Sequence, residues 1–286
     1  MSIEIKELEH TYNANTPFQH AALKGIDLEI PEGKVTAIIG QTGSGKSTLV
    51  QHLNGLLIPT AGTLDICGFH IQPLLKIKDV KELRRKVGLV FQFPEYQLFE
   101  ETIEKDIAFG PKNFGTSEED ARKLVNEILP YVGLDESYLE RSPFELSGGQ
   151  KRRVAIAGIL VLNPDVLVLD EPTAGLDPQG AKEMMQLFMN LNQKAGKTVV
   201  LVTHDMEHVM NYCDHVIILD HGKVKHESNV KTFFMHPEWI TSIGINPPGL
   251  IRLKLQLQKK GFDIPTSVLT MDELVECVTR QVKDHA

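Results

Sequence analysis

The chain has 286 residues, a formal net charge of −8 at pH 7 and a hydrophobic content of 42%. These values are typical of a globular protein with one large domain or two smaller ones. The acidic balance disfavours a nucleic-acid binder, and no apolar run approaches the roughly eighteen residues that a membrane span needs. The three cysteines lack metal-ligand spacing, which predicts a reducing compartment and thiols packed in the core.

Two strands are predicted at the start of the chain. Residues 3–12 alternate loosely between apolar and polar side chains, as an edge strand does, and residues 23–30 form a second strand that ends at the turn 31–33. Tyr12 lies upstream of a glycine-rich loop. Its ring could stack on an adenine base or could simply be a half-buried strand tyrosine, and the residues alone leave both possibilities open.

The glycine-rich loop at residues 40–47 reads Gly-Gln-Thr-Gly-Ser-Gly-Lys-Ser, between an apolar run at 35–39 and a helix predicted at 47–57. This is the phosphate-binding loop pattern in its strand-then-helix context, which disfavours a chance turn. The glycines let successive backbone N–H groups surround anionic oxygens, and the helix start adds its positive dipole end. Lys46 is predicted to reach the β- and γ-phosphates of a nucleotide, and the Ser47 hydroxyl to ligate Mg²⁺.

The middle of the chain begins with short strands predicted at 63–67 and 87–91, separated by a basic helix at 80–86. Gln92 follows the second strand, where a glutamine matters only if it reaches a metal. Residues 102–144 read as helical throughout, with Thr116 and Glu119 at capping-box spacing before a helix at 121–132. This pattern indicates a helical insertion into an α/β core.

The segment Leu146-Ser147-Gly148-Gly149-Gln150 precedes a helix predicted at 151–162. Ser147 suits the N-cap position, and the free N–H groups of that helix start could bind an anion. The spacing taken alone favours a plain capped turn.

Two further strands are predicted to end in ionisable residues. The apolar run 166–169 reads as a buried parallel strand, and Asp170 and Glu171 follow at its carboxyl end, where open α/β sheets place their ligands. Asp170 is suited to hold Mg²⁺ through water, and Glu171 to accept a proton from an attacking water. A strand at 198–202 leads to His204, and its convergence on the same crevice favours a functional over a structural histidine.

The last part of the chain starts with a hairpin of strands at 216–219 and 224–227. Residues 228–286 carry no recognisable chemistry, although Thr270 and Glu273 have capping-box spacing before an amphipathic helix that runs to residue 282. Residues 251–257 alternate strictly between apolar and polar side chains, and this period predicts a strand.

Taken together, these motifs resemble the ATPase subunits of ABC transporters over about residues 1–225. The resemblance rests on the phosphate loop, Gln92, the segment 146–150, the Asp170-Glu171 pair, the loop Ala174-Gly175-Leu176-Asp177 and His204. It implies an α/β P-loop fold with a mixed sheet core, an N-terminal antiparallel β-subdomain and a helical insertion at about 100–160. The expected domains are a nucleotide-binding domain at 1–227 and a C-terminal helical extension at 228–286.

The same resemblance implies that two such domains sandwich two ATP molecules. Glu171 and His204 would be catalytic, Tyr12 would stack on adenine, and Mg²⁺ would be held by Ser47, Gln92 and, through water, Asp170. The signature residues 146–150 would contact ATP bound at Lys46 of the partner, with Asp177 in the loop beside them. The implied nucleotide-binding residues are Tyr12, Gly40, Gln41, Thr42, Gly43, Ser44, Gly45, Lys46, Ser47, Thr48, Gln92 and Asp170, and the signature residues are Leu146, Ser147, Gly148, Gly149 and Gln150.

A narrower resemblance links the chain to the energy-coupling factor transporter ATPases, specifically the second member of their ATPase pair. It rests on residues 16–18, 51–56, 92–99, 104–111 and 172–178. That group implies a second, related ATPase in a heterodimer, a transmembrane coupling protein, and an exchangeable membrane protein that captures a vitamin or metal ion. It also implies a place at the cytoplasmic face of the cell membrane, no nucleic-acid partner, and a C-terminal extension that joins the two ATPases.

The two lines of reasoning conflict at residues 249–260, where the resemblance implies a helix and the period predicts a strand. We favour the helix, because a lone strand there would have no sheet to join. Other functions remain open: a homodimeric ATPase of a cobalt or nickel importer, a non-transport ABC ATPase acting on DNA or ribosomes, and a regulatory nucleotide sensor. The second would usually need tandem domains or a long coiled coil, and intact Glu171 and His204 disfavour the third.

Overall fold

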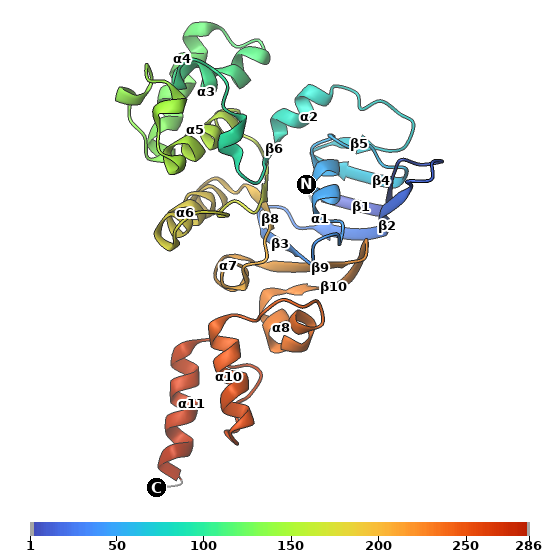
Figure 1. Ribbon diagram of the computed structural model, residues 1–286, viewed down its shortest axis with the longest axis vertical. Helices are drawn as coiled ribbons and strands as arrows, with labels where there is room; N and C mark the ends of the chain where they lie inside the picture. The colour runs from blue at the N-terminus through green and yellow to red at the C-terminus, as the bar shows by residue number, and fades with distance from the viewer. Residues whose placement is uncertain (1–2, 285–286) are drawn as a thin grey trace.

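The computed structural model describes residues 3–284 and is built around a six-stranded sheet of order β10-β9-β3-β8-β7-β6 (Figure 1). Residues 1–2 and 285–286, the outer ends of the two predicted domains, lie outside the described residues. All neighbouring strands pair in parallel except β9 and β10, which form the predicted hairpin. The strands are β3 (Val35–Ile39), β6 (Val87–Val90), β7 (Val166–Asp170), β8 (Thr198–Val202), β9 (His215–Asp220) and β10 (Lys223–Asn229).

The inner strands of this sheet are apolar on both faces because each face is covered by a separate core. Along β3, Ala37 and Ile39 enter the core beneath the helices, whereas Ile38 between them enters the core shared with the second sheet. Side chains alternate across a strand, so a strand covered on both sides reads as a continuous apolar run. This explains why β3, β7 and β8 were recognisable in the sequence.

The second sheet is antiparallel, with the order β2-β1-β4-β5. The prediction that residues 3–12 form an edge strand is wrong, because β1 pairs with β2 on one side and β4 on the other. Loose alternation shows that a strand is half-buried but not how many neighbours it has. The strands are β1 (Ile3–Tyr12), β2 (His20–Ile30), β4 (Ala61–Ile66) and β5 (Phe69–Ile71).

Helix α1 (Lys46–Leu53) contacts both sheets and ends four residues before the predicted end. Gly55 adopts a left-handed φ of 66°, and the N–H groups of residues 56 and 57 both turn back to the carbonyl of Gln51. Such a glycine-terminated turn satisfies the last carbonyls of a helix and stops it.

The helical insertion lies beyond β6, away from the antiparallel sheet (Figure 1). Within residues 102–144 the structure describes helices and no strand, as expected. The predicted cap is displaced by one residue, because the Ser117 hydroxyl, not Thr116, accepts the N–H of Asp120 at 3.1 Å. The helices of the insertion are α3 (Ile103–Asn113), α4 (Glu118–Ile128) and α5 (Gly148–Leu160), with 3₁₀ turns at Leu129–Val132, Glu136–Tyr138 and Pro143–Glu145. Helix α2 (Val80–Lys86) and a 3₁₀ turn at Pro94–Gln97 precede the insertion.

The C-terminal helices α10 and α11 project from the body of the molecule beyond α8 (Figure 1). Residues 251–257 are helical, as the resemblance implied. Ile251 and Leu255, four apart, pack on the main core, whereas Leu250 and Leu257 pack on a small core of the extension itself. The helices of this half are α6 (Pro178–Ala195), α7 (Met206–Tyr212), α8 (Val230–Met235), α9 (Pro237–Thr241), α10 (Gly249–Lys259) and α11 (Met271–Asp284).

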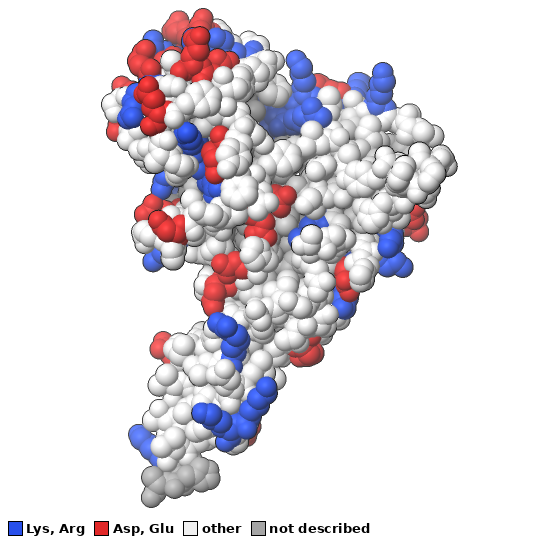
Figure 2. All heavy atoms as spheres, viewed as in Figure 1, with Lys and Arg blue, Asp and Glu red and all other residues white. Residues whose placement is uncertain are grey.

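The start of α11 carries the predicted capping box: the Thr270 hydroxyl accepts the N–H of Glu273, whose carboxylate accepts the N–H of Thr270. None of the helices described within residues 3–284 has both the length and the apolar surface needed to pass through a membrane. Charge is distributed unevenly over the surface: Figure 2 shows acidic side chains gathered over the helical insertion and basic side chains near α2.

Candidate functional site

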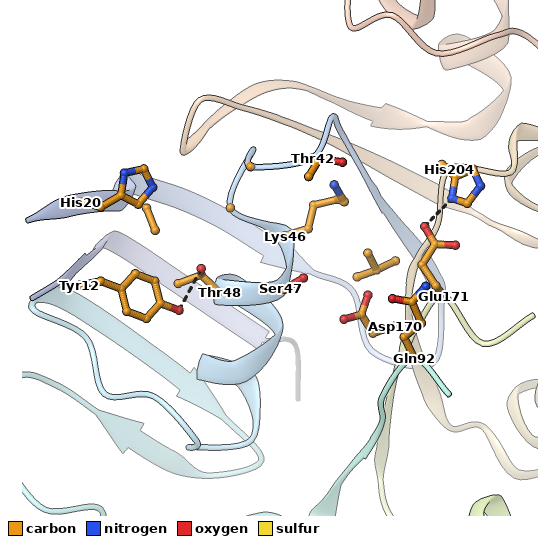
Figure 3. Close-up of a pocket in the computed structure, with 14 residues that line it drawn as sticks. Tyr12, His20, Thr42, Lys46, Ser47, Thr48, Gln92, Asp170, Glu171 and His204 are labelled. Atoms are coloured by element: carbon orange, nitrogen blue, oxygen red, sulfur yellow. Dashed lines mark hydrogen bonds and ion pairs between the residues drawn. The ribbon is translucent and has the colours of Figure 1, made fainter. Parts of the chain in front are cut away.

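A cavity of about 440 Å³ opens at the carboxyl ends of the central strands and brings together most of the predicted site residues (Figure 3). Tyr12 lies at one end, Lys46 near the middle, and Glu171 and His204 at the other end. The cavity is lined by Tyr12, His20, Ala22, Thr42, Gly43, Gly45, Lys46, Ser47, Thr48, Gln92, Asp170, Glu171, Val202 and His204.

The phosphate loop has the backbone that its glycines were predicted to allow. Gly43 and Gly45 have φ of 81° and 105°, a region that side chains disfavour. A Cβ on Gly45 would come within 2.8 Å of the Ala22 carbonyl oxygen, and one on Gly40 would collide with the Leu219 carbonyl oxygen. Glycine at positions 40 and 45 is therefore needed to pack the loop against β2 and β9.

Lys46 points into the cavity from the first turn of α1. Its Nζ donates to the carbonyls of Gly40 and Gln41 at 2.7 and 2.9 Å, so the amine is held beneath the loop. Burial lowers the pKa of this amine, and the nearby carboxylates of Glu171 and Asp170 oppose that shift. An anionic ligand in the cavity would likewise favour the charged amine.

Two strand ends place the ionisable residues opposite Lys46. Asp170 ends β7, and Glu171 follows with a left-handed φ of 48°, a strained conformation for a side-chain-bearing residue and one that clusters at functional sites. The Glu171 N–H still donates to the Val202 carbonyl at 2.9 Å, which fixes the turn against β8. The Glu171 carboxylate accepts a 2.7 Å hydrogen bond from Nδ1 of His204, so these two residues form a pair.

The donor set on this side of the cavity fits Mg²⁺. The Ser47 hydroxyl, the Gln92 amide and the Asp170 carboxylate all line the cavity and offer the oxygen ligands that this ion prefers. Burial and the neighbouring Glu171 raise the pKa of Asp170, despite the opposing charge of Lys46. A bound cation would stabilise the ionised carboxylate in this acidic pair.

At the other end of the cavity, Tyr12 is held by its hydroxyl and by its ring. The hydroxyl lies 3.2 Å from the Thr48 hydroxyl, and the His10 ring meets the Tyr12 ring edge-on at 4.5 Å between centroids. His20, which belongs to none of the predicted motifs, pairs with Tyr12 across the β1–β2 ladder and lines the same end. Only strand register brings His20 and Ala22 here, so no local pattern in the sequence marked them.

Residues 146–150, the predicted signature segment, lie elsewhere, at the start of α5 in the helical insertion, and do not line this cavity. The predicted N-cap is present: the Ser147 hydroxyl accepts the N–H of Gln150 in a full capping box. Leu146 is buried, whereas Ser147, Gly148 and Gly149 are exposed. A Cβ on either glycine would meet no atom of residues 3–284 within 4 Å, so packing within the described part of the chain does not require glycine there.

Asp177 and Arg152 organise the loop that follows Glu171. The Asp177 carboxylate accepts the Gly180 N–H at 2.7 Å and thus caps α6. Arg152, which no sequence motif singled out, is 2% exposed and donates to both carboxylate oxygens of Glu95 and to the carbonyls of Pro172 and Ala174. The Arg152 side chain therefore connects α5 to the segment after Gln92 and to the loop after Glu171.

Comparison with known proteins identifies the family to which this chain belongs. The family model described as ABC transporter matches residues 23–174. The chain is 53% identical over 286 residues to the energy-coupling factor transporter ATP-binding protein EcfA2 of Lactiplantibacillus plantarum, covering 100% of this chain and 97% of that protein. The chain belongs to the energy-coupling factor transporter ATP-binding proteins, within the ABC transporter family.

Two solved structures are also similar to this chain. The structure of cbiO1 from Clostridium perfringens, described as part of the ABC transporter complex cbiONQ, is 39% identical with a TM-score of 0.72 and covers 88% of this chain and 98% of its own. The ATP-binding cassette MJ0796, captured as a post-hydrolysis dimer bound to ADP and Pi, is 34% identical with a TM-score of 0.70 and covers 80% of this chain and 98% of its own. The predicted α/β P-loop fold and family are confirmed, and with them the role of an ATP-hydrolysing subunit of an ABC transporter.

Proposed function

We propose that this member of the family binds MgATP in the cavity described above and hydrolyses it at a closed interface with a second, related ATPase. The observation that carries the proposal is the convergence of Lys46, Glu171 and His204 from separate elements on one cavity. Hydrolysis would then power movement of a membrane-embedded coupling protein, which works with an exchangeable protein that captures a vitamin or metal ion. The chain would sit peripherally on the cytoplasmic face of the membrane.

The geometry supports a division of roles among the cavity residues. Lys46 and the N–H groups of residues 43–47 would neutralise the β- and γ-phosphates, with Tyr12 against the adenine. Ser47, Gln92 and, through water, Asp170 would hold Mg²⁺, which would supply positive charge to the phosphates. Glu171 would orient the attacking water and accept its proton, and His204, bonded to Glu171, would set the direction of that carboxylate and contact the γ-phosphate.

The exposed start of α5 supports a shared site. Neither Gly148 nor Gly149 has a left-handed φ that would call for glycine, and no atom of residues 3–284 occupies the space beside them. A reason outside the chain is therefore expected, and the γ-phosphate bound to a second ATPase provides one. The N–H groups of this helix start would then bind that phosphate, which makes ATP-driven closure a population shift towards the dimer.

Replacing Ser147 with arginine tests this arrangement. We expect Ser147→Arg to leave ATP binding to its own chain unchanged, because Ser147 lies outside the cavity, while turnover at the partner's site falls at least ~10-fold for want of the helix-start contact. Equilibrium dialysis with ATP and single-site turnover in a mixed dimer measure the two effects. A matched control is Ser142→Arg, at the N-cap of the preceding 3₁₀ turn. Loss of ATP binding by the substituted chain itself would contradict the proposal.

Two exposed apolar surfaces suit the proposed protein partners. Downstream of Gln92 in the sequence, the rings of Phe99 and Phe109 pack edge-on at 4.8 Å and are 57% and 44% exposed, which makes them a surface suited to the coupling protein. On α11, Met271, Val275 and Val282 are each more than half exposed and recur at helical spacing. We assign that stripe, within the proposed extension 228–286, to contact with the second ATPase.

A pull-down from the organism's own membranes in mild detergent tests the assembly. We expect a second related ATPase, a coupling protein and one or more small vitamin- or metal-binding membrane proteins. Lysine at Val275 and Val282 should weaken recovery of the second ATPase, because it charges the apolar stripe. Leu74→Lys, at a fully exposed leucine in the loop before α2, serves as the control. Self-association with a single permease would favour a homodimeric importer, and recovery of ribosomes or DNA alone would overturn the transport proposal.

A further inference from the structure

The C-terminal extension reaches the catalytic end of the nucleotide cavity. A second cavity, also of about 440 Å³, adjoins the first and shares Thr42, Lys46, Glu171 and His204 with it. Its remaining lining comes from the phosphate loop (Gly40 and Gln41) and from Gly244 and Ile245, which lie between α9 and α10. Figure 3 shows Lys46 on one side of this end and the Glu171–His204 pair on the other.

The contact between the two segments is close. Gly244 has a left-handed φ of 66°, and a Cβ built on it would lie 2.7 Å from Nε2 of Gln41. The N–H of Gly244 donates to the Thr241 carbonyl at 3.0 Å, so this glycine turns the chain at the end of α9. The glycine therefore does two things: it permits the turn, and it leaves room for the Gln41 side chain.

The residues around Gly244 are anchored firmly. Ile240 and Ile243 are buried in the main core, with 0% and 2% exposure. The N–H of Gly249, in the first turn of α10, donates to the Glu207 carboxylate of α7 at 2.7 Å. Helix α7 begins two residues after His204, and Asp205 caps it. The extension is thus linked to the catalytic residues twice, through Gln41 and through α7.

We propose that residues 243–245, here termed the elbow, form a wall of the ATP site at the γ-phosphate end, and that Gln41 and Gly244 are positioning residues which couple occupancy of that site to the C-terminal extension. The inference rests on the proposed function, because it takes ATP as the occupant. Lys46 serves the β- and γ-phosphates, so the cavity it shares with the elbow is the part that ATP fills and ADP leaves vacant. A γ-phosphate bound there displaces the Gln41 side chain, and the elbow and α10 move with it.

The single tryptophan of the chain provides a direct readout. Trp239 lies in α9, just before the elbow, and its indole stacks against the rings of His226 and of His236, with centroids at 4.6 and 4.5 Å. Because stacked imidazoles alter indole emission, any shift of α9 against β10 changes the fluorescence. No other tryptophan contributes to the signal.

The experiment titrates the full chain, in EDTA to prevent hydrolysis, with ATP and separately with ADP. Trp239 emission is followed, and equilibrium dialysis measures binding of the same nucleotides. We expect a saturable emission change with ATP that is much smaller with ADP. Gly244→Ala should weaken ATP binding about tenfold and leave ADP binding within about twofold, because the added methyl pushes the Gln41 amide towards the γ-phosphate position.

Gly196→Ala is the matched control. Gly196 has nearly the same φ, 65°, and also ends a helix, but a methyl group added to it would meet nothing within 4 Å. This variant therefore carries the backbone strain without the contact. In a Gln41→Ala background, Gly244→Ala should no longer change the ratio of ATP to ADP affinity.

Three outcomes would overturn the inference: ATP that binds without altering Trp239 emission, equal weakening of ATP and ADP by Gly244→Ala, or the same selective loss in Gly196→Ala. Failure of the wild-type chain to bind ATP in a parallel dialysis with Mg²⁺ in place of EDTA would instead overturn the proposed function on which the inference rests. The dialysis thus separates the two failures.

Discussion

Glu171→Gln should bind ATP and dimerise normally while its steady-state hydrolysis falls at least ~100-fold, the usual effect of losing a general base. Glutamine has the same shape as glutamate and can still accept the 2.7 Å hydrogen bond from His204. It cannot take a proton from water at neutral pH. Geometry and binding are therefore retained, and only the proton transfer is lost.

Phosphate release and ATP dialysis, measured on the same preparation, test this expectation. Glu183→Gln is a suitable control, because Glu183 is a half-exposed carboxylate on α6 outside the cavity, paired with Arg153. Turnover of the Glu171 variant within a few-fold of wild type would remove Glu171 from the proposed role. Loss of both binding and turnover would indicate instead that the carboxylate holds the site together.

Arg152→Ala should destabilise the chain by about 3–5 kcal/mol, the cost of removing one partner from a buried ion pair. The Arg152 and Glu95 side chains are 3% and 14% exposed and form two hydrogen bonds of 2.8 and 2.9 Å. Without the guanidinium, the Glu95 carboxylate and the carbonyls of Pro172 and Ala174 lose their donor together. Unfolding in urea measures the change.

The neighbouring residue provides the control. Arg153 is also on α5 and donates to Glu183 and to the Val132 carbonyl. The Arg153 and Glu183 side chains are 23% and 48% exposed, so Arg153→Ala should cost only about 1 kcal/mol. If both alanine variants lose similar stability, burial of the Arg152–Glu95 pair is not what stabilises this junction. Arg152→Ala should also lower turnover, because Arg152 holds the loop that follows Glu171.

The pH dependence has a definite sign. Burial raises the pKa of Glu95. The hydrogen bonds from Arg152 and from the backbone N–H of Glu95 itself, together with the Arg152 charge, outweigh burial and hold the pKa below the ordinary glutamate value. A carboxylate with a lowered pKa stabilises the fold above its unfolded-state pKa and loses that contribution as the pH falls through its folded-state pKa. The gap in unfolding free energy between wild type and Arg152→Ala should therefore narrow in acid.

Much of the site could be predicted because its residues occupy short, ordered motifs. The phosphate loop, the Asp170-Glu171 pair and His204 each follow an apolar run, and parallel strands bring their carboxyl ends to one edge of a sheet. Residues 251–257 show the limit of such local reasoning. Their period of two predicts a strand, yet they form α10. Ile251 and Leu255, four apart, pack on the main core, and Leu257 packs with Leu250, seven apart, on the extension's own core.

The sequence by itself determined the family, the central strands and the order of the chemical groups along the chain. Only the tertiary structure decided which distant residues meet. Arg152 reaches Glu95 across 57 positions, Gly244 reaches Gln41 across the whole domain, and β1 proves to be an inner strand with partners on both sides. A sequence motif reflects interactions among residues that are close together along the chain. Contacts between remote segments depend instead on strand order and packing, and no local pattern encodes these.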